Sequence, residues 1–477
     1  MQSKPYTVTD LFCGAGGTTT GIHLSGKATV IACINHDETA IKSHAANFPD
    51  CKHYIENIRL FNVNALQKCD IITMSAECTH FSIAKGGESR NADSRTLSEE
   101  LYRYIQHCEP KAVIVENVKE FLTWSDLIQK KDKQGNLVFK ENGQPYMIPN
   151  TDTNKKGSKY LEWVKNIKAM GYEYQSRVLN SADFGAYTSR VRYFGIFAKK
   201  GCEIKIQFPQ PTHAKKVPKN SEIQQWKAVK DLLNFDDKGK SIFDRKKPLC
   251  EKTLKRIYAG LQKFVPISQK EWILKYMSNS PTTGVNRGAT VNEPLHTITT
   301  QSRLGLCGIN QPLSTITTQG GKGLVSCAFL DKYYGIANAQ SIEKPCDTIT
   351  TVDRHSLIQP LFIEKAYSNC VPVGIDRPCD SLTTVNKFNL ITAAYSGENL
   401  QVNEKDSPYT KLIKLFMTEY GIYDIYQRML NVDNELKQIQ GFPKDYVLLG
   451  TQTQRTKFIG NSVNPQIMSA IFTKLLN

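Results

Sequence analysis

The chain has 477 residues, more than one ordinary hydrophobic core holds, so two domains are expected. Its 61 Lys and Arg against 45 Asp and Glu give a formal net charge of +16, which favours a polyanionic partner over a merely basic soluble protein. No apolar run reaches the ~18 residues of a membrane span, no signal peptide is evident, and the 13 cysteines include no Cys-x-x-Cys pair, so we expect a cytoplasmic protein with neither a metal site nor a disulfide framework.

The first predicted element is a strand at 6–12, followed at once by a glycine-bearing turn at 13–21 and by a helix that begins near Ile22. Glycines at such a turn let a ligand approach the backbone closely, and they direct the N-terminus of the helix at it. The turn alone is equally consistent with a plain tight turn that binds nothing.

The second predicted strand, 28–34, ends at Asn35, and the third ends at Asn57. In doubly wound nucleotide-binding sheets, an acidic residue at the end of the second strand binds the ribose hydroxyls. The amide oxygen of Asn35 accepts a hydrogen bond without carrying charge, and Asp37 stands close enough in sequence to compensate.

Three further blocks carry groups suited to covalent chemistry on a pyrimidine base. Cys78 follows an apolar run at a strand-to-loop turn, where an exposed thiol can act as a nucleophile. Glu116 ends the buried strand 112–115, and Arg190 and Arg192, two apart on a strand, point to the same face. Thiolate addition to C6 of cytosine makes C5 nucleophilic, a route that needs a cysteine, an acid near N3 and a cation near O2. The alternatives are a solvated strand-end carboxylate and a solvated basic strand edge.

Two other segments are distinctive. Residues 130–158 predict a polar insertion with a hairpin, which is either a solvated excursion or a contact to a nucleic-acid backbone. Residues 206–424 contain a repeated Pro-x-x-Thr-Ile-Thr-Thr-like unit, which is either a phosphate-contacting strand or a structural hairpin. The four units begin at Pro294, Pro312, Pro345 and Pro378. A helix is also predicted at 247–257, with Pro248 in its first turn.

These blocks resemble, in kind and in order, the motifs of the S-adenosylmethionine-dependent C5-cytosine methyltransferases. The turn at 13–21 and its preceding strand are similar to the family's Asp-Leu-Phe-x-Gly-x-Gly-Gly, and the other three blocks to Pro-Cys-Gln-x-Phe-Ser, Glu-Asn-Val and Gln-x-Arg-x-Arg. Residues 440–443 and 460–465 resemble the last two motifs of the family. The resemblance covers about 6–200 and 425–477.

The resemblance implies a fold and a division of the chain. A doubly wound, Rossmann-like α/β methyltransferase sheet is expected in residues 1–205, with the hairpin insertion near 130–158. A second, mostly β target-recognition domain is expected at 206–424. Residues 425–477 are expected to return to the catalytic domain and close the cofactor pocket.

The resemblance also implies roles for individual residues. Cys78 is expected to attack cytosine, Glu116 to hold N3 and the exocyclic amine, and Arg192 to bind O2 with support from Arg190. S-adenosylmethionine is the expected cofactor, and no metal is expected. The residues implied at the cofactor are Asp10, Phe12, Gly14, Gly16, Gly17, Asn35, Asn57, Ile58, Glu77, Asn461 and Val463.

The chain departs from the family pattern around the nucleophile and at the cofactor. Glu77 stands where the family has proline, Thr79 where it has glutamine, and Asn35 and Asn57 where it has acids. An ionised Glu77 that faced Cys78 would raise the pKa of the thiol and slow its attack. Neighbours in an extended chain point apart, so Glu77 can instead face the cofactor or bind backbone N–H groups.

The expected function is methylation of C5 of a cytosine flipped out of double-stranded DNA, by a monomer of bacterial or phage origin. A cognate restriction endonuclease is a candidate partner. One alternative is an RNA cytosine-5 methyltransferase, although the large middle region favours DNA. Another is a catalytically silent DNA-binding relative, against which the joint presence of Cys78, Glu116 and Arg192 argues.

Overall fold

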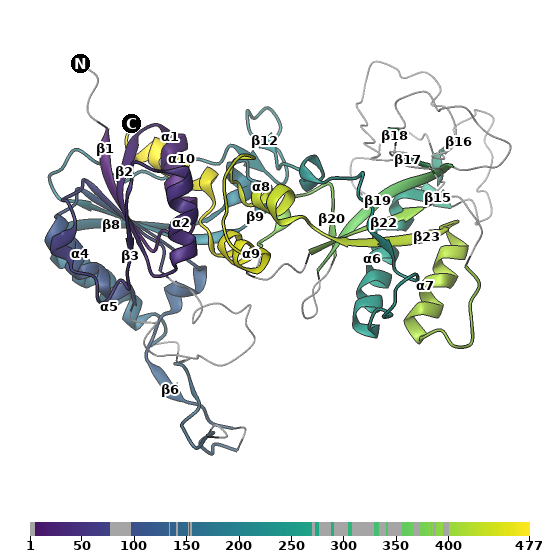
Figure 1. Cartoon of the computed structure of the whole chain (residues 1–477), viewed down its shortest axis with the longest axis horizontal. Coiled ribbons are helices and arrows are strands. Elements are labelled where there is room, and N and C mark those ends of the chain that lie inside the picture. The colour runs from purple at the N-terminus through teal and green to yellow at the C-terminus, as the bar shows by residue number, and fades with distance from the viewer. Residues whose placement is uncertain are drawn as a thin grey trace. The chain divides into compact units, whose positions relative to one another are not determined.

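The structure is a computed structural model of the chain, and it divides into two compact units (Figure 1). The first unit comprises Met1–Leu233, Asp376–Asn386 and Asn431–Asn477, and the second comprises Asn234–Ile375 and Lys387–Leu430. The residues that the structure describes are 5–76, 97–132, 134–139, 142–150, 152, 155–269, 272–275, 288–290, 304–307, 329–332, 340–341, 355–365, 372–382, 384, 388–394 and 400–477.

A seven-stranded sheet forms the centre of the first unit, in the order β3-β2-β1-β4-β5-β10-β8 (Figure 1). Strands β1 to β5 run parallel, and β10 is antiparallel to both of its neighbours. The strands are β1 (Tyr6–Leu11), β2 (Ala28–Asn35), β3 (Lys52–Ile55), β4 (Ile71–Met74), β5 (Ala112–Asn117), β8 (Tyr172–Asn180) and β10 (Val191–Lys199). The chain leaves β1 toward β2 on one side and later returns to β4 on the other, so the carboxyl ends of β1 and β4 form the switch point at which such sheets bind ligands.

Helices cover both faces of this sheet, which confirms the predicted doubly wound α/β fold. Alternate residues of β5 enter different cores: Val113 and Val115 pack with α4 and α5, whereas Ala112 and Ile114 pack with α1, α2 and α10. A strand buried on both faces needs apolar residues at every position, which explains the uninterrupted apolar run before Glu116. The helices are α1 (Gly17–Ser25), α2 (Glu38–Asn47), α4 (Leu101–Cys108), α5 (Ser158–Ala169) and α10 (Pro465–Leu475).

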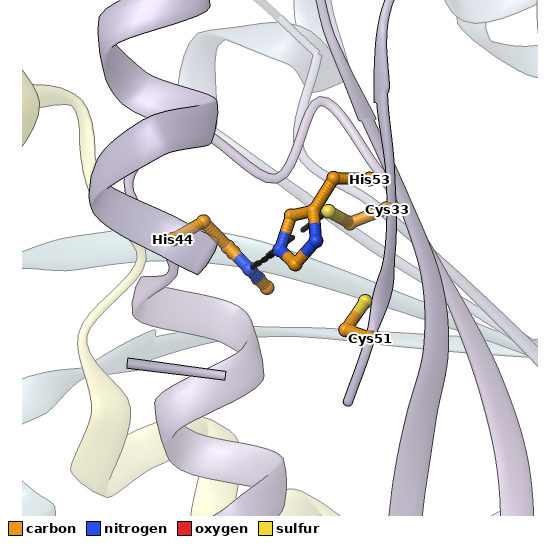
Figure 2. Close-up of side chains that lie close together, drawn as sticks. All are labelled: Cys33, His44, Cys51 and His53. Atoms are coloured by element: carbon orange, nitrogen blue, oxygen red, sulfur yellow. Dashed lines mark hydrogen bonds between the residues drawn. The ribbon is translucent and has the colours of Figure 1, made fainter. Parts of the chain in front are cut away.

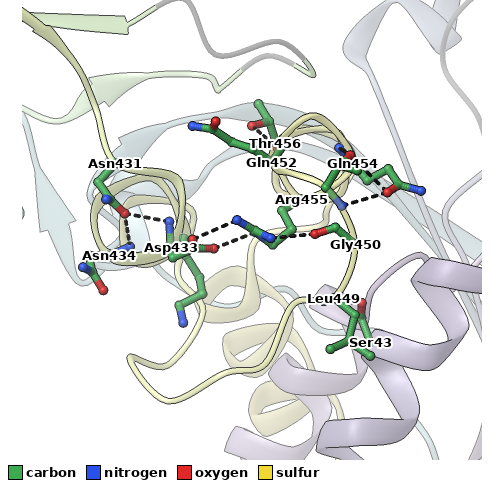
Figure 3. A network of polar contacts seen from close by, with 12 residues as sticks. Ser43, Asn431, Asp433, Asn434, Leu449, Gly450, Gln452, Gln454, Arg455 and Thr456 are labelled. Carbon is green, nitrogen blue, oxygen red and sulfur yellow. Dashed lines mark hydrogen bonds and ion pairs between the residues drawn. The ribbon is translucent and has the colours of Figure 1, made fainter.

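The C-terminal part of the first unit is fixed onto α2 by polar contacts (Figure 3). Within it, α8 (Lys437–Gln440) precedes α9 (Gln452–Asn461). In the first turn of α9, Arg455 Nε lies 2.9 Å from a carboxylate oxygen of Asp433. The N–H of Leu449 donates to Ser43 Oγ of α2 at 2.9 Å. Because these contacts hold both the first turn of α9 and the loop before it, α9 has a defined position against the carboxyl edge of the sheet.

The unit boundaries lie later than the sequence predicted. The expected breaks followed residues 205 and 424, whereas the first unit continues to Leu233, includes Asp376–Asn386, and resumes for the last time at Asn431. Polar contacts explain the later first break, since Thr212 N–H donates to the Asp183 carbonyl and Trp226 Nε1 to the Asp183 carboxylate, each at 2.9 Å.

Among its described residues, the second unit contains a seven-stranded antiparallel sheet in the order β13-β23-β22-β19-β17-β18, with β20 paired to β19. Its strands are β13 (Lys240–Ser241), β17 (Phe329–Lys332), β18 (Gln340–Ser341), β19 (His355–Lys365), β20 (Val373–Gly374), β22 (Phe388–Ala394) and β23 (Asp424–Met429). A small sheet consists of β15 (Gly288–Thr290), β14 (Trp272–Lys275) and β16 (Leu304–Cys307). Among the described residues of this unit, more lie in strands than in helices, in agreement with the predicted mostly β domain.

Two helices, α6 (Glu251–Gln269) and α7 (Pro408–Glu419), share an apolar core with β22 and β23 in this unit. The prediction of a helix from residue 247 was wrong at its start, because α6 begins at Glu251 and Pro248 precedes it. The carbonyl of Cys250 accepts the N–H of Thr253 at 2.8 Å, so the first helical hydrogen bond forms after the proline.

Short ladders complete the described structure. At the predicted insertion near 130–158, β7 (Met147–Pro149) pairs antiparallel with β6 (Leu127–Gln129), which lies just before the predicted bounds. The other short strands are β9 (Thr188–Ser189), β11 (His213–Ala214), β12 (Gln224–Gln225) and β21 (Cys379–Asp380). Over the described part of the chain, the helices include none with the length and apolar character of a membrane span.

Candidate active site

A pocket opens at the carboxyl ends of β1, β2, β4 and β5, at the switch point of the first unit's sheet. Its empty volume is about 920 Å³, open solvent at the mouth included. The lining residues are Phe12, Cys13, Gly14, Ala15, Thr18, Asn35, His36, Asp37, Ala40, Ser75, Ala76, Glu116, Val118, Arg190, Arg192, Lys457, Phe458, Asn461, Ser462 and Val463.

The predicted acid and both predicted arginines line this pocket together. Glu116 is buried at the end of β5, and its Oε1 lies 3.4 Å from Nε of Arg192. Arg190 lies between β9 and β10, is buried as well, and donates from Nη1 to the carbonyl of Gly460 at 3.0 Å. Burial raises the pKa of Glu116, and the charges of Arg192 and Arg190 oppose this rise. The carboxyl group therefore keeps a proton to a higher pH than an ordinary glutamate does.

The predicted nucleophile Cys78 and its neighbour Glu77 lie outside the described residues. The described chain that leads to them ends at Ala76, and both Ser75 and Ala76 line the pocket. Asn117 at the end of β5 donates from Nδ2 to the Ala76 carbonyl at 3.5 Å. The segment before Cys78 is thus part of the same pocket wall as Glu116.

The end of β2 places two polar side chains at the opposite part of the pocket wall. Asn35 Oδ1 accepts the N–H of Asp37 at 2.8 Å. Asp37 caps α2 with Oδ1, and its Oδ2 lies 3.3 Å from Nζ of Lys457 in α9. The Asp37 carboxylate thus already caps α2 and pairs with Lys457, so it has less hydrogen-bonding capacity left for a ligand than a free carboxylate would.

The glycine turn is divided between two uses. Gly14 lines the pocket with φ of 54°, and no atom lies within 4 Å of where a Cβ would stand, which leaves room for a ligand. Gly16 and Gly17 do not line the pocket. A Cβ on Gly17 would collide with Ser462 and the carbonyl of Val463, so this glycine admits the C-terminal segment.

Three other residues expected at the cofactor lie away from the pocket lining. Asp10 is buried beneath the turn, accepts hydrogen bonds from Thr19 at 3.0 Å and Thr73 at 2.8 Å, and has its pKa raised to about 7 by burial. Asn57 is exposed, and Ile58 is buried in the core between β-sheet and α4. Asn461 and Val463, in contrast, line the pocket.

Sequence reasoning missed several lining residues, among them His36, Thr18, Lys457 and Phe458. A signal for two of them was available: Lys457 and Phe458 precede Asn461 by four and three residues, which places them on the same face of α9. His36 stands beside Asn35 at a strand end, but nothing in its sequence context distinguished it.

The fourth repeat unit lies in the first unit rather than in the second. Its residues Cys379 and Asp380 form β21, which pairs in parallel with β9 beside Arg190. The N–H of Cys379 donates to the Tyr187 carbonyl at 2.8 Å, and Thr188 Oγ1 donates to the Asp380 carbonyl at 3.2 Å. This fourth repeat therefore supports β9, the strand that leads to Arg190 and Arg192. The repeats that begin at Pro294, Pro312 and Pro345 lie outside the described residues.

Comparisons with known proteins agree with this geometry. The model of the family described as C-5 cytosine-specific DNA methylase matches residues 6–143 and 131–477. Similar curated proteins include Type II methyltransferase M.AquIA of Picosynechococcus, 28% identical over 47% of this chain and 86% of that protein. Type II methyltransferase M1.ScrFI of Lactococcus lactis subsp. cremoris is 27% identical over 50% of this chain and 53% of that protein. Type II methyltransferase M1.HphI of Haemophilus parahaemolyticus is 26% identical over 43% of this chain and 49% of that protein. The chain thus spans about half the length of these two relatives. The family match covers nearly the whole chain, and the chain therefore belongs to the C-5 cytosine-specific DNA methylases.

Proposed function

We propose that this chain transfers the methyl group of S-adenosylmethionine to C5 of a cytosine flipped out of duplex DNA. The observation that carries the proposal is one pocket whose wall contains the buried Glu116 paired with the half-buried Arg192 and, at the end of β2, the polar groups of Asn35 and Asp37. Glu116 and Arg192 suit a pyrimidine, and the polar groups at the end of β2 suit the hydroxyls of a nucleoside. Family membership gives the substrate class and the cofactor class.

The residues present fit S-adenosylmethionine. Phe12 offers an aromatic face for adenine, Gly14 an open backbone, and Asn35 an amide group for the ribose hydroxyls, whose oxygen also accepts the N–H of Asp37. The cofactor, when bound, supplies an electrophilic methyl group on a sulfonium. Lys457 and Phe458 of α9 close the pocket on the side of the C-terminal segment.

At the base, the chain's own groups divide the work. A neutral Glu116 carboxyl both donates and accepts, which matches N3 and the exocyclic amine of cytosine, and its raised pKa favours that neutral form. Arg192 offers N–H donors for O2, and Arg190, tied to the Gly460 carbonyl, positions the site. Cys78 is proposed to add its sulfur to C6; C5 then bonds to the methyl carbon as the sulfonium bond breaks, and loss of the C5 proton expels the thiolate.

The second unit is proposed to select the DNA sequence, and an endonuclease of matching specificity is a proposed cellular partner. The alternatives remain an RNA cytosine-5 methyltransferase and a silent DNA-binding protein. An assay with duplex DNA and with RNA as methyl acceptors separates them, because the first alternative methylates RNA alone and the second binds DNA without transfer.

The direct test of the covalent step uses duplex DNA that carries 5-fluorocytosine at the target. Fluorine at C5 prevents the final elimination, so the wild type is expected to form a complex that survives denaturing electrophoresis. Cys78→Ala is expected to form none, while Cys250→Ser, which changes an exposed thiol of the second unit, behaves as wild type. Undiminished methylation by Cys78→Ala would contradict the proposal.

A further inference from the structure

Four soft and borderline ligands lie together beneath the glycine turn, in a part of the first unit that the proposed reaction does not use. They are Cys33, His44, Cys51 and His53, and their ligand atoms all lie within 4.8 Å of one another. Figure 2 shows the four side chains directed toward a common point between β2, α2 and β3. The sequence predicted no metal because it has no Cys-x-x-Cys pair; here the ligands come from separate elements.

The local fold explains how the ligands meet. Cys33 on β2 is in register with His53 on the neighbouring parallel strand β3, so both side chains leave the sheet on the same face. Helix α2 covers that face and presents His44 from its last turn. Cys51 directly precedes β3. The β2–α2–β3 segment therefore assembles the cluster without any contribution from the rest of the chain.

The distances suit tetrahedral coordination. His44 Nδ1 lies 2.9 Å from His53 Nε2 and 3.8 Å from Cys33 Sγ. Zinc–sulfur bonds of about 2.3 Å and zinc–nitrogen bonds of about 2.0–2.1 Å at tetrahedral angles place ligand atoms about 3.3–3.8 Å apart. All four ligand atoms lie within 4.8 Å of one another, so movements of up to about 1 Å bring these side chains to coordination geometry.

Hydrogen bonds around His44 direct a lone pair into the cluster. Thr19 Oγ1 donates its one proton to Asp10 at 3.0 Å, so it accepts from Nε2–H of His44 at 2.9 Å. Nδ1 of His44 is then unprotonated and faces Cys33 and His53. Metal-bound histidines usually donate their other ring N–H to a carboxylate, a carbonyl or water, and here a threonine hydroxyl bonded to a buried carboxylate takes that place.

Charge balance also favours a divalent ion. Cys33 and His44 have no exposed surface, and Cys51 is 6% exposed. A net charge in such surroundings is costly, whereas one divalent cation with two thiolates and two neutral imidazoles has none. Two cysteines and two histidines are a common donor set for structural zinc.

We infer that Cys33, His44, Cys51 and His53 form a structural binding site for a zinc-class divalent cation. Binding replaces the two thiol protons, which are released to solvent, and forms two metal–sulfur and two metal–nitrogen bonds. The site lies under the turn that lines the pocket: the position of a Cβ on Gly16 is 3.1 Å from the His44 ring, and Cys33 shares a buried core cluster with Cys13, a pocket residue. Its consequence is a rigid support for the glycine turn.

Metal content of the full chain tests the inference independently of methyl transfer. Protein purified without a metal-affinity step is expected to carry about one zinc per chain by mass spectrometry of its elements. Cys51→Ser is expected to lower the zinc content per chain at least about fivefold. Cys108→Ser is the matched control, because Cys108 is also buried in the first unit and in contact with another cysteine, Cys69, but has no histidine partner in that contact. It is expected to retain the metal.

A spectroscopic measurement keeps the test decisive if Cys51→Ser does not fold. Wild-type protein stripped by a chelator and given Co²⁺ is expected to show the intense visible bands of tetrahedral cobalt and sulfur-to-cobalt charge transfer, and its Tm, lowered by stripping, is expected to recover. The inference would be overturned if wild-type protein were purified without metal and showed none of these bands after addition of Co²⁺. Full metal content in Cys51→Ser, or a disulfide between Cys33 and Cys51 in the freshly purified, unreduced chain, would also overturn it.

Discussion

Glu116 combines burial with two nearby guanidinium groups, and the balance between them decides its protonation. Burial disfavours the carboxylate, and Arg192, with Nε at 3.4 Å, and Arg190 favour it. The net direction is a raised pKa. As the pH rises through that pKa, Glu116 loses the proton that cytosine N3 is proposed to receive.

We therefore expect single-turnover methylation to fall as the pH rises through the Glu116 pKa, above the ordinary value of 4.5. Glu116→Gln keeps a donor and an acceptor for the base but has no proton to transfer, so its rate is expected to fall by about 10²–10⁴-fold with little change in DNA affinity. The variant also lacks this step in its pH–rate profile. A profile that keeps the step in Glu116→Gln assigns it to another group.

Asn35 gives a second prediction at this scale. A neutral hydrogen bond contributes about 0.5–1.5 kcal/mol and a charged one about 1.5–3 kcal/mol, so Asn35→Glu is expected to tighten S-adenosylmethionine binding by up to about tenfold without a change of product. Calorimetry measures this directly. Asn57→Asp is the matched control, because Asn57 does not line the pocket, and its affinity is expected to stay within about twofold of the wild type. Impaired turnover in Asn35→Glu would instead indicate a pocket adapted to a different donor.

The sequence predicted single residues well where a strand end alone determines their position. Glu116 and Asn35 lie at the ends of apolar strands of the parallel sheet, Phe12 directly follows one, and each lines the pocket. Asn57 followed the same reasoning, but β3 ends at Ile55, so the chain has left the sheet edge before it. The cysteine and histidine cluster escaped prediction because strand register and a covering helix, rather than sequence spacing, bring its members together.

At the scale of elements, the contact between α1 and the C-terminal segment determines one wall of the pocket. Gly17 at the start of α1 and Gly21 one turn later both face this segment, and a Cβ on either would meet it. The segment in turn supplies Asn461 and Val463 to the pocket. Small residues on α1 are therefore a condition for closing the site.

Gly17→Ala is expected to lower the free energy of unfolding by about 1–3 kcal/mol, because its Cβ collides with Ser462 and the carbonyl of Val463 in a packed interface. Chemical denaturation measures the change, and cofactor affinity is expected to fall with it. Gly14→Ala is the control: no atom lies within 4 Å of its Cβ, so its stability loss, from φ of 54° alone, is about 1 kcal/mol. Equal losses of stability in both variants would show that packing at Gly17 is not the cause.

Elements were predicted best where periodicity and burial agree. The parallel strands and α1 follow from apolar runs and the glycine turn, whereas the start of α6 was misplaced because proline suits both a first turn and the extended chain before a helix. The fourth repeat was grouped with its sequence neighbours, but a parallel pairing with β9 places it in the first unit. Pairing between distant segments is not encoded in a local pattern.

At the scale of the whole molecule, the first unit contains the pocket, and the net charge of +16 on the chain favours binding of a polyanion such as DNA. Lys and Arg that neutralise phosphates release counterions, so the logarithm of DNA affinity falls with the logarithm of salt concentration by about 0.9 per phosphate. We expect a loss of about 10³-fold between 50 and 200 mM salt, for about six such contacts, by fluorescence anisotropy. S-adenosylmethionine affinity is the internal control and is expected to change little; a salt-independent DNA affinity would contradict the assigned partner.

The central claim is cytosine C5 methylation of DNA in the pocket of the first unit. Bisulfite sequencing of DNA from cells that express the chain tests it, because the method reports both methylation and its sequence context. We predict protected cytosines within one short recognition sequence in cells with the wild type and with Cys250→Ser, and none in cells with Cys78→Ala. A genome without protected cytosines when the wild type is expressed and folded, or one equally protected by Cys78→Ala, would contradict the account.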